Sequence, residues 1–437
     1  MWGRGAAIQP GRSGPDRCYT ARMNPKRLLP GLAAAVLGTA TLTLGAQGAL
    51  PAAPLMLTNA AVVDVATGEV RRGQILVLRD GRIESIGATA PPPGTAPLRV
   101  DLGGRYVIPG LIDAHVHIAS RAAMRAALES GVTTVRSAGV SHFADVGLRE
   151  LVTKGYLAGP DVLAAGYHVR PQPAEEAWFD APDLGDVMPG LTTPEALRRF
   201  VRFNLAENVD WIKVLATERA GTPDTDPRQQ VYTETELALV VSEAAARGVP
   251  VMAHAHGAEG ALAAVRAGVR SIEHGTYLTD ATLKLMVSRN AYFVPTADVV
   301  NDLAEPGGDY QGAALERRGQ MLKPVLVATI GRARAAGVKI VTGSDTGYGP
   351  SSMARVSREV NELVAAGLTP LAALQSATSL NAEMLRLEKR IGYLRPGFEA
   401  DLVVVDANPL EDPHTLLDPL YVVSNGKVAL DRLRFGR

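Results

Sequence analysis

The stretch GRYVIPGLIDAHVHIAS, residues 104–120, is a run of mostly apolar residues that ends with two histidines, His115 and His117. Side chains two positions apart on a β-strand point to the same face, so both imidazoles can reach one point in space. Two converging imidazoles are suited to binding a metal ion. The alternative is a pair of histidines that are solvated or hydrogen-bonded in the core, and this stretch alone does not separate the two interpretations.

Downstream of this stretch, short apolar segments typical of buried strands alternate with amphipathic or alanine-rich segments typical of helices, such as ELALVVSEAAARG and EGALAAVRAG. Eight such alternations predict an α/β fold, a (β/α)8 TIM barrel, whose active site lies at the carboxyl ends of the strands. A doubly wound parallel sheet is the alternative. The expected strands cover residues 111–117, 131–137, 161–167, 210–216, 249–255, 269–274, 291–296 and 338–344.

Both flanks of this middle segment contain short β-like segments separated by turns. Residues 55–108 and 389–437 are therefore expected to form one small β-sandwich domain built from both chain ends, with residues 109–388 as the TIM-barrel domain. The chain has 437 residues, of which 46% are hydrophobic, enough for one large and one small domain.

Residues 1–49 have the pattern of a targeting leader. Lys26 and Arg27 precede the apolar segment LLPGLAAAVLGTATLTLGA, and Met23 is the expected start. This predicts a signal peptide, a periplasmic or secreted protein, and no membrane span in the mature form; a membrane anchor is the alternative. The single cysteine, Cys18, lies in the leader, so the mature chain would have no disulfide.

The charge balance argues against polyanionic partners. The chain contains 45 Lys and Arg residues and 45 Asp and Glu residues, and without its basic leader it would be mildly acidic. Neither nucleic acid nor an anionic membrane is therefore an expected partner.

Polar residues stand at the carboxyl ends of five of the expected strands. One histidine in such a position is more often structural than functional. A barrel, however, gathers its strand ends around one mouth, so residues far apart in the sequence converge there. Five histidines, a lysine and an aspartate at these ends are difficult to attribute to chance: His115, His117, Lys213, His254, His256, His274 and Asp345.

In order along the chain, IPGLIDAHVH, a lysine at a strand end, HAHG, IEHG and GSD resemble the motifs of the metal-dependent amidohydrolase superfamily. The closer likeness is to its imidazolonepropionase-like and Xaa-Pro-dipeptidase-like branch, which includes ochratoxin-hydrolysing amidohydrolases, and it covers residues 55–437. The resemblance implies two divalent metal ions, expected to be Zn2+, bridged by Lys213 after carboxylation by carbon dioxide. It implies the remaining metal ligands as His115, His117, His254, His274 and Asp345.

The implied chemistry is consistent with the residues present. A buried lysine can lose its proton and react to give an anionic carbamate, and Lys213 would do so unless it simply pairs with Asp210 or Glu218. Two neighbouring divalent ions lower the pKa of a shared water and polarise a carbonyl group. Asp345 would take the proton of that water and pass it to the leaving amine.

Further histidines are candidates for substrate contacts. His254 and His256 compete for one ligand role; by the family spacing to His274 the ligand is His254, which leaves His256 to contact the substrate. His168, in AAGYHVRP, stands where relatives place a substrate-contacting histidine. His142 is a weaker candidate. The expected catalytic residues are thus Asp345, His256 and His168.

Two loops depart from the family pattern. This chain has RSAGV after the second strand, where RDAGG is common, and GYHVRPQPAEEAWFDAPDLGDVMPG after the third, where a GGHG loop is common. Both loops shape the substrate pocket, so the family's substrates transfer less readily than its metal site. Arg170, in the second of these loops, is expected to bind a substrate carboxylate unless it is a solvated loop residue.

The sequence therefore predicts a binuclear amidohydrolase that cleaves the amide C–N bond of a small-molecule substrate by metal-activated hydroxide. A homo-oligomer is expected. N-acyl amino acids, Xaa-Pro-type dipeptides and ochratoxin-like amides are the expected substrates. A mononuclear deaminase, a cyclic amide hydrolase or a lactonase of the same superfamily is the alternative. Deaminases typically lack the bridging lysine and carry a glutamate closer to the fifth-strand histidine than Glu259 is to His254. A non-catalytic secreted metal-binding protein is the alternative from another class.

Overall fold

The computed structural model of the protein describes residues 54–89, 98–306, 309–350 and 352–433. The predicted leader, residues 1–49, lies outside the described residues, so the signal peptide stays a prediction. Among the helices of the described ranges, none is long and apolar enough to cross a membrane.

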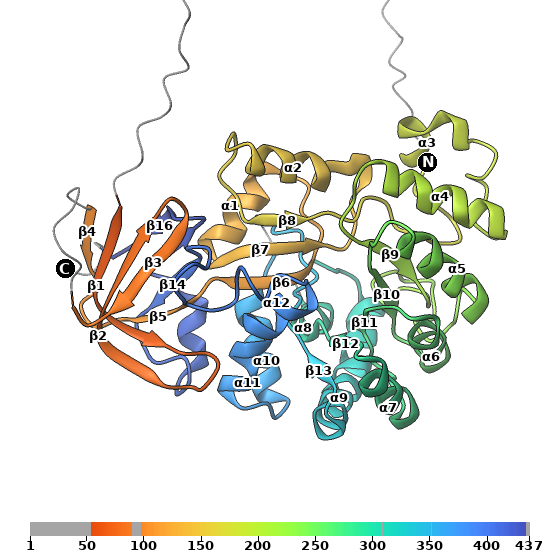
Figure 1. Ribbon diagram of the computed structural model, residues 1–437. Coiled ribbons are helices and arrows are strands. Elements are labelled where there is room, and N and C mark those ends of the chain that lie inside the picture. The colour runs from red at the N-terminus through yellow and green to blue at the C-terminus, as the bar shows by residue number, and fades with distance from the viewer. Residues whose placement is uncertain (1–53, 90–97, 307–308, 351, 434–437) are drawn as a thin grey trace, which may run out of the picture. The chain divides into compact units, whose positions relative to one another are not determined.

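Strands from both ends of the described chain form one mixed eight-stranded sheet (Figure 1). These strands are β1 (Leu55–Val63), β2 (Val70–Arg79), β3 (Arg82–Gly87), β4 (Leu98–Asp101), β5 (Tyr106–Pro109), β14 (Leu402–Val405), β15 (Tyr421–Ser424) and β16 (Lys427–Asp431). Their order is β16-β15-β14-β5-β1-β2-β3, and β4 pairs with β1 outside this path. The two chain ends meet where β14 pairs antiparallel with β5, with Val403 opposite Ile108.

The predicted β-sandwich is not confirmed, because these eight strands are assigned to a single sheet. The long strand β1 accounts for this continuity. Residues 55–58 pair with β4, whereas residues 61–62 pair with β5. Between the two halves Asn59 has a φ of 55°, and the register of β1 with β2 shifts. Such an irregularity bends a strand, so β1 serves two neighbours within one sheet. The domain boundaries expected from the sequence stay a prediction.

The middle of the described chain contains eight parallel strands in two sheets, β6-β7-β8 and β9 to β13. Each expected strand overlaps one of them. Neighbouring strands are consecutive in the sequence, which is typical of a TIM barrel, whereas a doubly wound sheet reverses its order at a switch point. The strands are β6 (Leu111–Val116), β7 (Val132–Ser137), β8 (Asp161–Leu163), β9 (Ile212–Leu215), β10 (Val251–Ala255), β11 (Ser271–His274), β12 (Tyr292–Val294) and β13 (Lys339–Ile340).

Isolated parallel bridges cross both gaps between these two sheets. Val169, beyond β8, pairs with Val214 of β9, and Val116 of β6 pairs with Thr346, beyond β13. The arrangement is therefore a TIM-barrel-like α/β fold, while its closure into one continuous eight-stranded sheet stays a prediction.

The expected strands 161–167 and 338–344 each end four residues earlier in the structure, at Leu163 and Ile340. Two amides beyond β8 donate to the buried carboxylate Asp145, and beyond β13 the amide of Ser344 donates to Asp113. A backbone donor that is satisfied by a side chain no longer needs a neighbouring strand. These segments therefore leave their sheets before the site is reached and enter it as loops.

Helices follow the strands and lie outside them (Figure 1). The two quoted helical segments are confirmed: α5 begins after Thr233, which forms a capping box with Glu236, and α6 ends at Gly268, whose φ is 96°. The α-helices are α1 (Arg121–Glu129), α2 (Ala144–Thr153), α3 (Ala177–Asp180), α4 (Pro194–Ala206), α5 (Glu234–Ala245), α6 (Ala258–Ala267), α7 (Asp280–Arg289), α8 (Ala297–Ala304), α9 (Ala313–Ala336), α10 (Val356–Ala365), α11 (Pro370–Ser376) and α12 (Ser379–Met384). Short 3-10 helices are η1 (Ser141–Phe143), η2 (Pro182–Leu184) and η3 (Pro413–Leu417).

Candidate active site

The carboxyl ends of the barrel strands surround one cavity, and every residue predicted to bind metal or to act in catalysis lines it. They come from β6, β9, β10 and β11 and from the segments beyond β6, β8, β10 and β13. The structure thus brings together residues from across the sequence, as the barrel interpretation requires. These residues are His115, His117, His168, Lys213, His254, His256, His274 and Asp345.

Two of these residues have a left-handed backbone, with φ of 70° at His274 and 53° at Asp345. Residues other than glycine seldom adopt this conformation, and it concentrates at functional sites because it directs a side chain that regular structure would turn away. At His274 the left-handed backbone ends the alternation of side chains between the two faces of β11. As a result Glu273 is buried in the barrel interior while His274, its neighbour in the sequence, still lines the cavity.

Five of the cavity histidines have one ring nitrogen in a hydrogen bond to the protein. Such a bond fixes the ring and leaves its other nitrogen for a ligand. The contacts are His115 Nδ1 to Glu273 Oε2 (2.7 Å), His117 Nδ1 to the carbonyl of Gly139 (2.7 Å), His254 Nε2 to the carbonyl of Glu218 (3.0 Å), His256 Nδ1 to Thr276 Oγ1 (2.9 Å) and His274 Nδ1 to Thr296 Oγ1 (2.8 Å).

Burial keeps four of these rings neutral at pH 7. It lowers the pKa of His115 to about 4 and that of His256 to about 3, and it lowers the pKa values of His254 and His274 well below the ordinary range. A neutral imidazole offers a lone pair, which is the form that binds a metal.

A carboxylate oxygen of Asp345 and the Nε2 atoms of His115 and His117 lie close together, and all three are hydrogen-bond acceptors. Asp345 Oδ1 lies 3.0 Å from His117 Nε2 and 3.5 Å from His115 Nε2, although each ring already uses its Nδ1–H elsewhere. Two acceptors this close need a cation between them, either a proton or a metal ion. Burial raises the pKa of Asp345, but His115 and His117 outweigh it, so the pKa is held well below its usual range.

Lys213 lies in the same cluster and is 2% exposed. Its Nζ donates to His115 Nε2 over 3.1 Å. Burial lowers its pKa to about 8, which brings the neutral amine within reach near pH 7. Neither acid considered as its partner in the sequence takes that role, because Asp210 pairs with Arg149 (2.5 Å) and the Glu218 contact to the site is through its carbonyl. Within the described ranges, Lys213 forms no ion pair.

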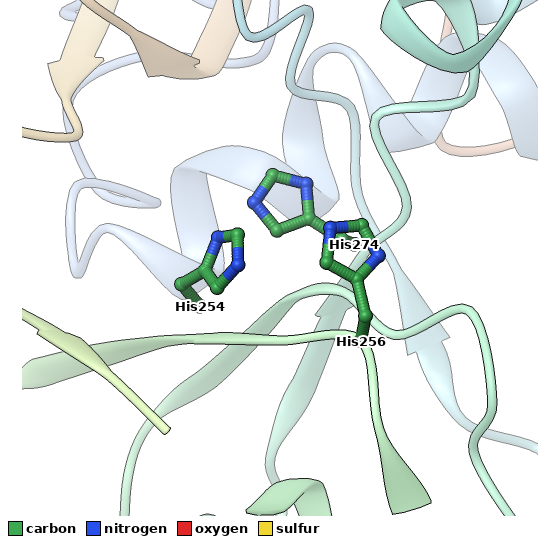
Figure 2. A group of neighbouring side chains, drawn as sticks. All are labelled: His254, His256 and His274. Carbon is green, nitrogen blue, oxygen red and sulfur yellow. The ribbon is translucent and has the colours of Figure 1, made fainter. Parts of the chain in front are cut away.

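Two groups of donor atoms in the described part of the chain have the spacing of a metal site. One contains His115, His274 and Asp345, and the other contains His254, His256 and His274. Figure 2 shows the second group: the rings of His256 and His274 are stacked 4.7 Å apart, and the ring of His254 faces them. Neutral imidazoles and a carboxylate are ligands that divalent ions of the zinc type prefer, so the residues present fit such a centre. Because His254 and His256 belong to one group, the choice between them stays a prediction.

A buried ion pair supports the cluster from inside the barrel. Arg136 of β7 donates to both carboxylate oxygens of Glu273 over 2.9 Å, and Glu273 in turn accepts from His115 Nδ1. Burial raises the pKa of Glu273, but Arg136 and His115 outweigh it and lower the pKa to about 2. Glu273 therefore stays ionised and holds the His115 ring with its Nε2 toward the cavity. Sequence reasoning missed this pair, although Glu273 directly precedes a predicted ligand.

Replacing Arg136 with methionine is expected to lower the free energy of unfolding by about 3–5 kcal/mol, because it leaves the Glu273 carboxylate buried without its partner. Urea denaturation followed by circular dichroism measures this. The control is Arg125→Met, which breaks an exposed ion pair to Glu129 and is expected to cost less than about 1 kcal/mol. Equal losses in the two variants would contradict the prediction.

His168 reaches the cavity beside His117, with their rings 5.7 Å apart, and its Nε2 is buried without a hydrogen-bond partner in the described structure. Gly139 makes room for it, since a Cβ there would lie 2.3 Å from His168 Cδ2. His142, the weaker candidate, is outside this cavity: it is on the surface, where Nδ1 lies 3.2 Å from Asp180 Oδ2. Arg170 lines two outer cavities rather than the inner one.

Other lining residues were not predicted from the sequence. Arg219 and Tyr310 border the cavity, and Val299, Val300 and Leu303 of α8 form an apolar wall. Arg219 and Tyr310 lie in loops, beyond β9 and beyond α8, so no periodic pattern marks them. The valines and the leucine follow the helical spacing of a packed core helix, which gives no sign of a cavity.

Comparisons with known proteins agree with this geometry. The model of the amidohydrolase family matches residues 106–429. Ochratoxinase from Aspergillus niger is 26% identical over 393 residues, covering 80% of this chain and 81% of that protein. A crystal structure of a Xaa-Pro dipeptidase with bound methionine has a TM-score of 0.76 at 27% identity, covering 86% and 99% of the two chains. A prolidase complexed with N-methylphosphonate-L-proline has a TM-score of 0.74 at 28% identity, with the same coverage.

Proposed function

This chain belongs to the amidohydrolase family and is a hydrolase of C–N bonds, and we propose that it is a binuclear enzyme cleaving the amide bond of a small substrate. The observation that carries the proposal is the cluster of fixed histidines around Lys213 and Asp345 in one cavity. In the proposed site, His115 and His117 would hold one divalent ion and His254 and His274 the other. Carboxylated Lys213 would supply oxygen ligands to both ions, and Asp345 would be a further ligand.

When bound, the two ions would polarise the scissile carbonyl and lower the pKa of the attacking water. The residues of the chain supply the remaining chemistry. Asp345 takes the proton from the water at a carboxylate oxygen and delivers it to the leaving nitrogen. His256, whose Nδ1 is occupied by Thr276, can direct its other nitrogen to the substrate carbonyl. His168, whose ring lies next to that of His117, offers an unpartnered nitrogen to the substrate.

The proposed substrates are N-acyl amino acids, Xaa-Pro-type dipeptides and ochratoxin-like amides. The names of the similar proteins support this class, because an ochratoxinase and two enzymes of the prolidase type are among them. Arg170 is the proposed contact for the substrate carboxylate, and a charge-assisted bond of this kind would orient the scissile bond.

We expect the zinc-loaded protein to hydrolyse at least one amide of this panel and to lose that activity after dialysis against a chelator. The expected content is two zinc ions per chain, measured by elemental analysis, and activity is expected to return when zinc is restored. Retention of full activity after complete removal of metal would contradict the proposal. As a control, chelator-treated protein is compared by circular dichroism, so that unfolding is not mistaken for loss of a cofactor.

The same panel separates the alternatives. A deaminase would release ammonia from an amino-substituted ring, and a lactonase would cleave lactones faster than amides. A metal-binding protein without activity would bind zinc and turn over none of these compounds. Glu259 supports the amidase over the deaminase, because it lies on the exposed side of α6 rather than in the cavity.

Export and assembly are separate proposals. The leader pattern supports a periplasmic or secreted enzyme that starts at Met23 and loses its signal peptide, which amino-terminal sequencing of the exported protein would test. We also propose a homo-oligomer, which light scattering of the mature enzyme would test.

A further inference from the structure

Arg219 lines both the active-site cavity and the two cavities next to it. It follows β9 in the loop that leaves the barrel mouth, and it lines the inner cavity together with the predicted metal ligands. It also lines two outer cavities, which share Leu215 and His168 with the inner one. Arg170 lines both outer cavities. Arg219 therefore connects the lining of the inner cavity with that of the two outer cavities, which Arg170 also lines.

Within the described ranges no ion pair and no side-chain hydrogen bond involves either arginine, although Glu176 lines both outer cavities and Glu175 and Glu218 line one of them. Arg170 Nε is buried without any acceptor. Burial lowers the pKa of Arg170, and the positive charge of Arg219 lowers it further, whereas Glu176 and Glu218 raise it. Leaving a buried cationic donor unpaired is unfavourable, and an anion placed between two guanidinium groups would relieve both costs.

A third arginine holds the Arg219 loop in place. Arg318 of α9 donates to four backbone carbonyls of the segment directly after Arg219: those of Ala220 and Thr222 (both 2.6 Å), Pro223 (2.8 Å) and Thr225 (2.7 Å). Gly221, in the same segment, admits the ring of Tyr310, whose Cε1 would lie 2.4 Å from a Cβ at that position. The loop is thus fixed by groups that leave the Arg219 side chain free for a ligand.

Another part of the cavity lining is unsuited to an anion, because Val299, Val300 and Leu303 of α8 are apolar. A substrate that contains both a carboxylate and an apolar group matches this mixed lining. We infer that Arg219, assisted by Arg170, binds the carboxylate of the amino-acid part of the substrate and is the residue that makes the enzyme prefer acids over neutral amides. This inference rests on the proposed amidase function and refines it.

The test compares a matched pair of substrates: the best acid of the amide panel and its C-terminal carboxamide. For the wild type, kcat/KM is expected to be about 10- to 100-fold higher for the acid, the range typical of a hydrogen-bonded charge. Arg219→Gln is expected to remove most of this preference, mainly through a higher KM for the acid, and to change kcat/KM for the carboxamide less than about threefold. Arg219→Lys, which keeps the charge but not the planar fork, is expected to be intermediate.

Arg317→Gln is the matched control, because Arg317 is the exposed neighbour of Arg318 on α9 and lines none of the three cavities. It is expected to leave both substrates unaffected. Metal content and thermal stability of each variant are measured as well. Inhibition by the free amino acid is compared with inhibition by its amide, which gives a second readout that does not need turnover of these compounds.

Equal losses for both substrates in Arg219→Gln, or an unchanged acid preference, would overturn the inference. A wild type that hydrolyses amides without preferring the acid would overturn it too, whereas failure to hydrolyse any amide would instead overturn the proposed function.

Discussion

Replacing Lys213 with alanine is expected to remove bound metal and to lower kcat by about 10³-fold or more. The magnitude corresponds to roughly 4 kcal/mol of transition-state stabilisation, the scale of electrostatic assistance that a metal centre supplies. Metal content and activity are expected to fall together, because the lysine is the only bridge that the proposed site contains between its two pairs of histidines.

The surroundings of Lys213 make this residue a reactive amine rather than a structural cation. Its Nζ is buried next to His115 Nε2, and its pKa is lowered to about 8 by burial. The acid nearest in sequence, Asp210, is bound by Arg149 instead. A lysine that merely stabilised the fold would be expected to have a carboxylate partner, since an unpaired buried ammonium is costly.

The measurement is elemental analysis and steady-state kinetics on the purified variant, with and without a short carboxylic acid such as acetate or propionate. Partial recovery of both metal and activity with the acid is expected, since its carboxylate can occupy the place of the missing carbamate. Lys339→Ala is the matched control. Lys339 lies on another barrel strand, does not line the cavity, and pairs with Glu383, with Nζ 2.6 Å from Oε1. Full activity in Lys213→Ala would rule out the bridge.

The barrel strands could be predicted because their signal is local. Runs of apolar residues separated by helical periodicity identify β6, β10 and β11 within a few residues of their observed bounds. The ends of β8 and β13 could not be predicted, because the groups that satisfy their backbone amides are distant in sequence. Asp113, for example, accepts from the amide of Ser344, 231 positions away. The single eight-stranded sheet could not be predicted either. The same short strands and turns can form one sheet bent at Asn59 or the two sheets of a sandwich, and the sequence pattern does not distinguish them.

The residues of the candidate site also differ in whether they could be predicted from the sequence. Histidines at the ends of strands are visible because the barrel topology itself brings strand ends together, so position in sequence implies position in space. Arg219 and Tyr310 lie in loops whose course depends on distant contacts. The hydrogen bonds from Arg318 to the carbonyls after Arg219 are an example, and no local sequence pattern predicts them. His142, the weaker candidate, differs from the histidines at strand ends: it lies in a loop, and its side chain pairs with Asp180 at the surface.

The Asp345→Asn variant is expected to lower kcat by about 10²- to 10⁴-fold while the protein stays folded and retains at least one metal ion per chain. Asparagine keeps the size of the side chain and one oxygen that can bind a cation. It also tolerates the left-handed backbone at this position, where φ is 53° and most other residues would be strained. The amide cannot accept a proton from water near neutral pH, so the variant removes the proton transfer with little change in shape.

Leaving-group dependence identifies the step that is lost. If Asp345 protonates the departing nitrogen, substrates with more acidic leaving groups need less help, so the deficit of Asp345→Asn is expected to shrink from an alkyl amide to a nitroanilide of the same acid. Asp406→Asn is the control, because Asp406 is an exposed carboxylate of the eight-stranded-sheet region that pairs with Arg105 at 3.1 Å. Turnover of Asp345→Asn close to that of the wild type would assign the proton to another group, and the remaining candidates lining the same cavity would be His256 and His168.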